Sequence, residues 1–253
     1  MIAKHEFFFF ALSVAVLWLA AQAGTCLRRR LGKMQQDDRD DLTIVLTAGL
    51  TLLGLIVGFS FSMAVTRYNQ RKDYEAAEAS AIRLAYLRAE LLPAGDAARV
   101  RELLKGYVRQ RVQFYLTHDE AGLQQISAAT IQTQMELWNA ARAPAETRQT
   151  STVTLAIAGV NDILNMEGLT QAAWWNRIPV GGWALMAAIA VCCNFLIGFT
   201  ARRAEVTRKR FFVLPLLVSI AFFLVADIDN PRHGVIVVHP LNLENVSLLL
   251  GAR

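Results

Sequence analysis

The sequence is poor in the residues that usually build catalytic or metal sites. Its 253 residues include three cysteines and four histidines, with no CxxC pair and no Cys/His spacing typical of a zinc or redox site. The motifs GxSxG, HExxH, GxGxxG and the P-loop are also missing. We therefore expect no enzyme activity, no cofactor and no bound metal, and we interpret Cys26, Cys192 and Cys193 as small apolar packing residues.

Charge is scarce as well. Charged residues make up 19% of the chain, against about 25% in soluble domains, and hydrophobic residues make up 54%. The net charge of +5 is not gathered into a basic patch interleaved with aromatic residues, which argues against nucleic acid as a partner. The apolar residues are clustered in long runs, which indicates a protein embedded in a lipid bilayer.

Four apolar runs are candidate membrane spans, since about 20 apolar residues cross a hydrocarbon core of about 30 Å. They are Phe7–Leu27, Leu42–Thr66, Ile178–Ala201 and Phe211–Ala226. The last is short and contains Pro215, so it needs its flanks or local bilayer thinning to cross. The first ends at Arg28-Arg29-Arg30, which fits a membrane anchor; a signal peptide cleaved near Ala21-Gln22-Ala23 is the alternative.

The predicted fold is an all-α membrane protein with four transmembrane helices and a helical extramembrane bundle between spans 2 and 3. Residues 1–66 would hold the first two spans, 67–176 the bundle, 177–227 the last two spans, and 228–253 a tail on the side of the bundle. The tail and the bundle lie on the same side because spans 3 and 4 cross the membrane once in each direction. Each short loop, Arg28–Asp41 and Arg202–Arg210, carries five Lys or Arg, so the positive-inside rule places the loops in the cytoplasm and the bundle outside.

Helix-forming residues and turn signals divide the bundle. We expect helices over Tyr68–Leu92, continuing the second span without a break, Ala97–Leu116, Ala121–Arg142, and from Pro144 to about Trp175. Asp96, and either Thr117 or Asp119, are predicted N-caps. In the tail, Gly234–Val238 is a candidate strand and Leu241–Leu250 a candidate short helix.

Three features are candidate functional sites, and each also has a purely structural interpretation. Gly54-x-x-x-Gly58 indicates close helix packing, either within the chain or at a subunit interface or pore. Four charged residues recur at helical spacing: Arg67, Arg71, Glu75 and Glu78. They could form a solvated row of ion pairs on the helix surface or a charged vestibule of a pore. The segment 227–234 carries Asp227 and Asp229, which suit turn capping with ion pairing, simple solvation, or binding of a hard cation.

Several motifs resemble one bacterial family, the bestrophin-like membrane proteins otherwise described as a domain of unknown function. They are Gly58–Ala64, Arg67-Tyr68, Arg71, Glu78-Ala79, Ala81-Ile82, Leu87–Ala89, Leu91–Pro93, Asp227–Arg232 with Gly234, Pro240 and Asn242-Leu243. More distantly, Val57–Phe59 and Val65–Arg67 are similar to the pore-lining second helix of the bestrophin anion channels. The chain departs from the family at Ser80 and Arg83, where Asn and Gly are frequent.

The resemblance implies a homo-oligomeric ion channel or pore-forming protein, passing several times through the bacterial inner membrane and acting on inorganic ions. Its pore-lining candidates are Leu55, Phe59 and Ser62, with Phe59 at a hydrophobic constriction. Its charged-vestibule candidates are Arg67, Arg71, Glu75, Glu78, Arg88, Asp227, Asp229 and Arg232. Bestrophins keep the large domain in the cytoplasm, opposite to the charge bias, so both orientations stay open.

The alternative function is a membrane sensor or assembly module. Its helical domain would bind a ligand or partner, and the uninterrupted helix over Leu42–Leu92 would transmit the change.

Overall fold

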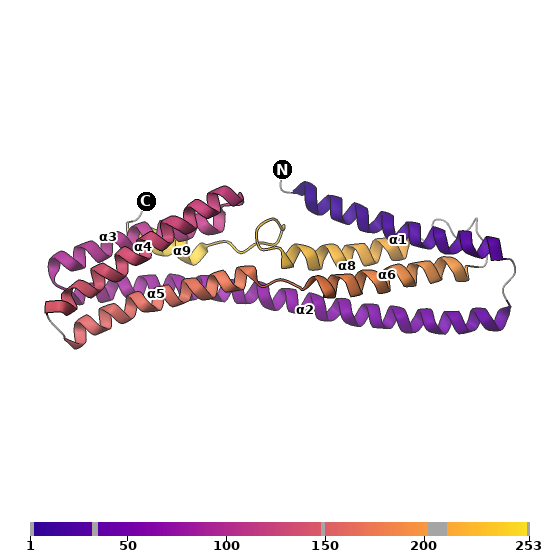
Figure 1. The fold of residues 1–253 in the computed structure, drawn as a ribbon, viewed down its shortest axis with the longest axis horizontal. Helices are drawn as coiled ribbons and strands as arrows, with labels where there is room; N and C mark the ends of the chain where they lie inside the picture. The colour runs from indigo at the N-terminus through magenta and orange to yellow at the C-terminus, as the bar shows by residue number, and fades with distance from the viewer. Residues whose placement is uncertain (1–2, 32–34, 148–149, 202–211, 252–253) are drawn as a thin grey trace. The chain divides into compact units, whose positions relative to one another are not determined.

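The structure is a computed structural model that describes residues 3–31, 35–147, 150–201 and 212–251. These residues are almost entirely helical (Figure 1). The helices are α1 (Ala3–Leu31), α2 (Gln36–Arg88), α3 (Ala94–Leu116), α4 (Glu120–Thr147), α5 (Ser151–Trp175), α6 (Val180–Thr200), α8 (Val213–Asp229) and α9 (Leu241–Leu249), with a 3-10 turn over Ala89–Leu91. The all-α class is therefore confirmed for the described residues.

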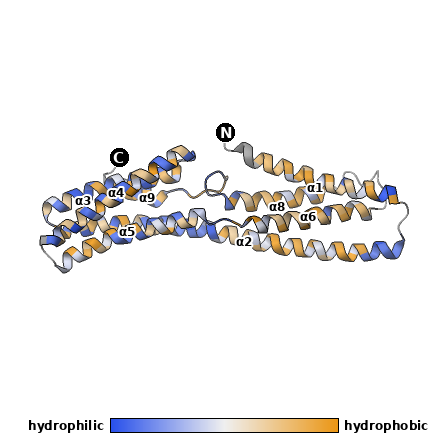
Figure 2. Cartoon of the chain, in the orientation of Figure 1, coloured by the Kyte–Doolittle hydropathy of each residue, from blue (hydrophilic) through white to orange (hydrophobic). Residues whose placement is uncertain are grey.

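The chain forms two compact units. The first, which we call the apolar unit, contains Met1–Thr66 and Arg177–Ile236. The second, the polar unit, contains Arg67–Asn176 and Val237–Arg253. Figure 2 shows the difference in composition: α1, α6 and α8 are mainly apolar, whereas α3 and α4 alternate between apolar and polar residues.

Among the described residues, three helical stretches are long and apolar enough to cross a membrane: Phe7–Leu31, Gln36–Leu91 and Ser151–Thr200. The charge-free part of the third is α6. At 17 residues, α8 is shorter than a usual span. The start of the fourth predicted span, at Phe211, lies outside the described residues.

In the apolar unit, α1 and α6 approach closely because glycine lies at their contact. A Cβ atom added to Gly198 would overlap the carbonyl oxygen of Ala21, and one added to Gly24 would overlap that of Phe195. Small residues allow such an approach in a membrane, where van der Waals contact holds helices together. Leu17 of α1 is buried next to Met186 of α6 in the small apolar core of this unit.

Basic side chains bind the C-terminal end of α6. The Arg28 guanidinium donates to the carbonyl of Phe199 at 3.1 Å, and Arg39 donates to the carbonyl of Thr200. The last carbonyls of a helix have no partner within the helix and carry partial negative charge, so arginine is favourable there. Two basic residues of the predicted loop Arg28–Asp41 thus have a structural role.

Helix α2 runs for 53 residues without interruption. At about 1.5 Å per residue it is about 80 Å long, far more than a membrane core requires. Its continuation beyond the second predicted span confirms the unbroken helix expected from the sequence. The helix and its 3-10 turn end just before Pro93, as expected because the residue before proline avoids helical conformation.

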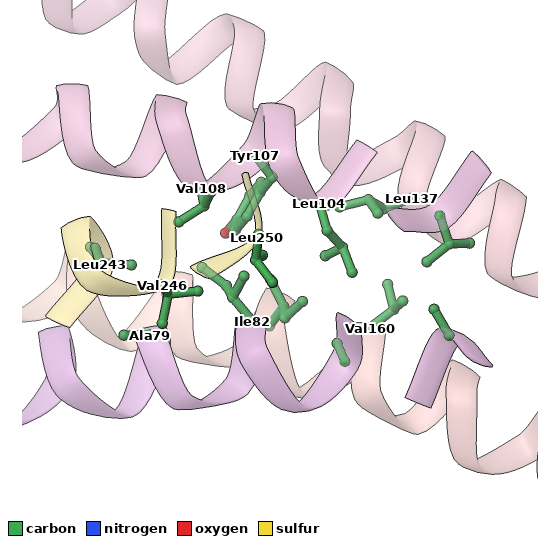
Figure 3. Packing of buried hydrophobic residues seen from close by; sticks show 14 of the residues in the cluster. Ala79, Ile82, Leu104, Tyr107, Val108, Leu137, Val160, Leu243, Val246 and Leu250 are labelled. Carbon is green, nitrogen blue, oxygen red and sulfur yellow. The ribbon is translucent and has the colours of Figure 1, made fainter. Parts of the chain in front are cut away.

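The polar unit has a continuous core supplied by α2, α3, α4, α5 and α9. Figure 3 shows Ile82, Leu104, Tyr107, Val160 and Leu243 among the side chains that meet there. Each of them is at most 1% exposed. Trp174 packs edge-on against Phe114 and Tyr115 in this core.

Several local predictions are corrected. Helix α4 includes Pro144, and α5 starts at Ser151 with Thr150 as N-cap, so the start predicted at Pro144 is wrong, whereas the predicted end at Trp175 is confirmed. Proline breaks or kinks a helix by removing a hydrogen bond and by clashing with the carbonyl four residues earlier. Because Pro144 lies in the last turn of α4, this disruption falls where the helix ends. Pro93, not Asp96, is the N-cap of α3.

Other local predictions concern the ends of α4 and the tail. Asp119 accepts a hydrogen bond from the amide of Gly122 at 2.7 Å, which confirms it as the cap before α4. The predicted short tail helix is confirmed as α9. The predicted strand over 234–238 is wrong, because that segment is irregular and no strand occurs among the residues that the structure describes.

Candidate functional site

One face of α2 in the apolar unit is left uncovered by the rest of the chain. Leu55 is 54% exposed and Phe59 is 63% exposed, and Ser62 is also exposed. The opposite face is buried, with Leu53 at 3% and Ala64 at 0%. The three pore-lining candidates therefore share the outward face of this helix, which we call the open face of α2.

The two glycines predicted to pack closely lie near this face. A Cβ atom added to Gly54 or to Gly58 would meet no atom within 4 Å. Gly49 behaves differently, because a Cβ atom there would lie 2.9 Å from the Cys193 sulfur. Within the described chain, the Gly54-x-x-x-Gly58 spacing does not serve helix packing.

Polar atoms on the open face are already satisfied. The hydroxyls of Thr43, Thr47 and Thr51 donate to the carbonyls four residues earlier, at 2.8 to 2.9 Å. These residues, with Ile44, Ala48, Leu52 and Leu55, line a shallow groove of about 650 Å³. Because these hydroxyl protons are bonded within the helix, they do not require a water partner, and the surface of the groove is mostly apolar.

Three of the predicted vestibule residues lie on the other side of α2. Arg71, Glu75 and Glu78 are 0%, 1% and 0% exposed, inside the polar unit. Each binds a different element of that unit. Their hydrogen bonds and ion pairs connect α2 to the helices packed on it.

Glu75 caps α9. Its carboxylate accepts hydrogen bonds from the amides of Asn242 and Leu243, both at 2.9 Å, and from the Asn242 side chain at 2.6 Å. The first amides of a helix have no partner within it, and a carboxylate satisfies both their hydrogen bonds and their partial positive charge. Arg71 does the reverse at the end of α5, donating to the carbonyls of Ala173 at 3.2 Å and Asn176 at 3.4 Å.

Glu78 forms a buried ion pair with Arg111 of α3. Thr170 of α5 donates to the same carboxylate at 3.1 Å, and Glu167 lies 3.6 Å from the Arg111 guanidinium. Burial raises the pKa of Glu78, against the opposing effect of Arg111 and Thr170. Burial also disfavours the charged form of Arg111, but Glu78, Tyr107 and Glu167 together outweigh this and raise the pKa of Arg111, so the guanidinium stays charged.

Asp227 and Asp229 bind backbone amides of the apolar unit. Asp227 accepts from Val235 at 2.6 Å and from Ile236 at 2.9 Å. Both oxygens of Asp229 accept from the amide of Ile178, at 3.0 and 3.2 Å. This is the turn-capping role. In the part of the chain that is described, no group of three His, Cys, Asp or Glu side chains could hold a metal ion.

The remaining predicted residues are dispersed. Arg88 pairs with Asp162 at 3.1 Å on the surface of the polar unit. Arg67 is half-buried on α2, and Arg232 follows the Asn230 turn, where its amide donates to the Asn230 side chain at 3.4 Å. Arg67 and Arg88 thus belong to α2, and Arg232 to the turn after α8.

Sequence reasoning missed Arg111, Glu167 and Thr170 as partners of Glu78. A signal was available for Arg111, because it interrupts the apolar stripe that includes Tyr107, Val108 and Tyr115 on α3. A charged residue in such a stripe predicts a buried partner of opposite sign.

No curated protein sequence matches the chain. Its fold is similar to crystal structures of a bacterial bestrophin homologue from Klebsiella pneumoniae: a point mutant, at TM-score 0.67 and 14% identity over 98% of both chains, and a structure phased with zinc, at TM-score 0.66 and 14% identity over 96% of both chains. The sequence profile of the Bestrophin-like domain matches residues 8–243. The chain therefore belongs to the bestrophin-like family of membrane proteins.

Proposed function

We propose that this chain assembles into a homo-oligomeric ion channel of the bacterial inner membrane, with the open face of α2 lining the ion path. The observation that carries the proposal is that face itself. Leu55, Phe59 and Ser62 are exposed on a helix without charge from Leu42 to Thr66, and the adjacent Gly54 and Gly58 have no neighbour in the chain. One helix cannot enclose a pore, so several copies would surround it.

The chemistry of the open face suits a gated path. Phe59 is the largest side chain on it, and a ring of such residues would form a narrow apolar constriction. Water leaves a constriction of this kind readily, which blocks ions until the ring widens. The satisfied threonine hydroxyls leave no strong ligand that would trap an ion.

The proposal includes a fourth crossing by α8. Helix α9 packs in the polar unit, where Glu75 of α2 caps it. If α6 crosses the membrane away from the side of the polar unit, the chain has to return before it reaches α9. Only α8 lies between α6 and α9 among the described helices, and its 17 residues are about 26 Å long, enough for a slightly thinned bilayer.

The test is ion flux through liposomes that contain the purified protein, comparing wild type with Phe59→Ala. Removing the ring should widen the constriction and raise the flux severalfold. Phe61→Ala is the matched control, because Phe61 is also exposed, at 42%, but lies about 100° from Ser62 around the same helix. A protein that shows no flux for anions or cations, as wild type and as Phe59→Ala, contradicts the channel.

The second candidate function, a sensor or assembly module, is supported by a groove on the polar unit. It has a volume of about 580 Å³ and lies between α4 and α5. Its lining combines Met135 and Trp138 with the amide side chains of Gln134, Asn139 and Asn161. An apolar wall with a few polar groups is typical of small-molecule sites.

Trp138 provides the measurement for this second candidate. A ligand in the groove should quench or shift its fluorescence and raise the unfolding temperature of the wild type but not of Trp138→Ala. If the protein conducts no ions and such a ligand is found, the sensor replaces the channel. If no compound in a small-molecule screen changes the wild type more than the variant, the groove is not a ligand site.

A further inference from the structure

The open face of α2 continues past the apolar unit, because α2 is one uninterrupted helix. Each residue turns a helix by about 100°, so eleven residues bring Asp73 back to within about 20° of Ser62. Asn69 and Ser80 fall on the same side by the same count, seven and eighteen residues on. All three are exposed, whereas Arg71, Glu75 and Glu78 point the opposite way into the core of the polar unit.

Asp73 is the charged residue nearest the middle of this face. The neighbouring Lys72 lies about 80° away from the direction of Ser62. Arg83 lies about 60° away and ten residues further on, about 15 Å along the helix. This separation exceeds the Debye length of about 8 Å at physiological ionic strength, so Arg83 cannot neutralise the field at Asp73.

The basic residues suggested by the sequence are engaged elsewhere. Arg71 is buried and donates to the end of α5. Arg88 pairs with Asp162, and Arg111 pairs with Glu78. Arg67, five residues after Ser62, lies about 140° away from its direction. These arginines therefore do not supply positive charge at the middle of the open face.

We infer that Asp73 is the selectivity-determining residue of the proposed channel, and that its ring of carboxylates makes the path favour cations over anions. This inference rests on the proposed function. In an oligomer with α2 around the axis, every copy adds one carboxylate at the same height, and like-signed rings select ions by charge. The exposed Asn69 and Ser80 provide neutral oxygen atoms on either side of this ring.

The test is the ratio of sodium to chloride permeability, measured in bilayers under a salt gradient, for wild type and for Asp73→Asn, Asp73→Glu and Asp73→Lys. One charge at about 6 Å from an ion in water changes its local concentration about threefold, and a ring acts more strongly. We therefore expect a sodium-selective wild type, a fall of about threefold or more in Asp73→Asn, and a preference for chloride in Asp73→Lys. Asp73→Glu should keep the wild-type ratio.

Glu102→Gln is the matched control, because Glu102 is an exposed carboxylate on α3, and it should leave the ratio unchanged. The two levels of failure are distinguishable. Absence of current in the wild type overturns the channel itself. Current with an unchanged ratio in Asp73→Asn, or with a wild type that prefers chloride, overturns the role of Asp73 and leaves the channel standing.

Discussion

Single residues of α2 hold the polar unit together through the ends of other helices. Glu75 binds the beginning of α9, and Arg71 binds the end of α5. Helix ends carry unpaired backbone groups with partial charge, so a buried charge of the right sign satisfies several at once. This explains why α2 carries charged residues on its buried side.

Replacing Glu75 by alanine should loosen α9. The change removes the acceptor for three hydrogen bonds to Asn242 and Leu243, and unsatisfied buried donors cost about 1–3 kcal/mol of unfolding free energy. Thermal unfolding in detergent should show the loss, and amide hydrogen exchange should accelerate within Leu241–Leu249. Equal unfolding temperatures for Glu75→Ala and the surface control Glu102→Ala would show that the cap is dispensable.

The Glu78–Arg111 pair should behave as a coupled unit. Removing one partner of a buried pair leaves the other charge unpaired and costs about 3–5 kcal/mol. We therefore expect Arg111→Met and Glu78→Leu to be strongly destabilising alone, and the double variant to lose clearly less than the sum. A double-mutant cycle from thermal unfolding measures the coupling; additive effects would mean that the two side chains do not interact.

At the scale of elements, most helices could be predicted from the sequence, because turn residues and apolar spacing are local signals. Helix α4 begins after the predicted cap Asp119 and α9 begins at the predicted Leu241, whereas α3 begins after Pro93 and not after the predicted cap Asp96. The boundary between α4 and α5 could not be predicted from Pro144, because a proline can also occupy the last turn of a helix, where the disruption it causes coincides with the helix end. The threonine and serine at 150–152 were the better signal for the start of α5.

The candidate site could be predicted only in part. The register of α2 can be counted from the sequence, and the nine residues from Ser62 to Arg71 make about two and a half turns, which places these two residues on opposite faces. The pore-lining candidates around Ser62 and the vestibule candidates around Arg71 therefore cannot share one face of α2. Which set is buried depends on Asn242 and Arg111, whose positions follow from the tertiary fold.

Two glycine substitutions should have opposite outcomes. Gly198→Ala places a methyl group on the backbone of α1 at Ala21, and overpacking of this kind costs about 1–3 kcal/mol. Gly58→Ala meets no atom of its own chain and removes the helix penalty of glycine, about 1 kcal/mol. Thermal unfolding of the purified protein compares them.

A Gly58→Ala protein as unstable as Gly198→Ala, while still of wild-type size on a sizing column, would show that α2 is packed within the chain at this point. If Gly58→Ala instead changes the size of the oligomer without changing the unfolding of its subunits, Gly58 lies between copies.

The whole molecule should show a fixed pattern of membrane sides. The four crossings that we propose would place His118 and Leu249 on one side and Gln36 on the other, and all three residues are exposed. Single cysteines at these positions, in a chain whose three native cysteines are replaced by serine, can be labelled with a membrane-impermeant maleimide in intact and permeabilised cells. Labelling of His118→Cys in intact cells would support the orientation from loop charge, and its protection would support that of bestrophins.

The pattern, whatever its orientation, tests the number of spans. Gln36→Cys and His118→Cys accessible from the same side would contradict a crossing by α2. Leu249→Cys on the side opposite to His118→Cys would contradict a crossing by α8.

The polar unit is also discontinuous along the chain, and this sets an order of events during synthesis. Sixty residues, 177–236, separate its main part from the segment that contains α9. At about 5–20 residues per second, the ribosome needs about 3–12 s to make them. During that time the carboxylate of Glu75 has no helix to cap, so this domain becomes complete only after the last apolar helices have been translated, and a nascent chain that stalls between them exposes an unfinished bundle to proteases and chaperones.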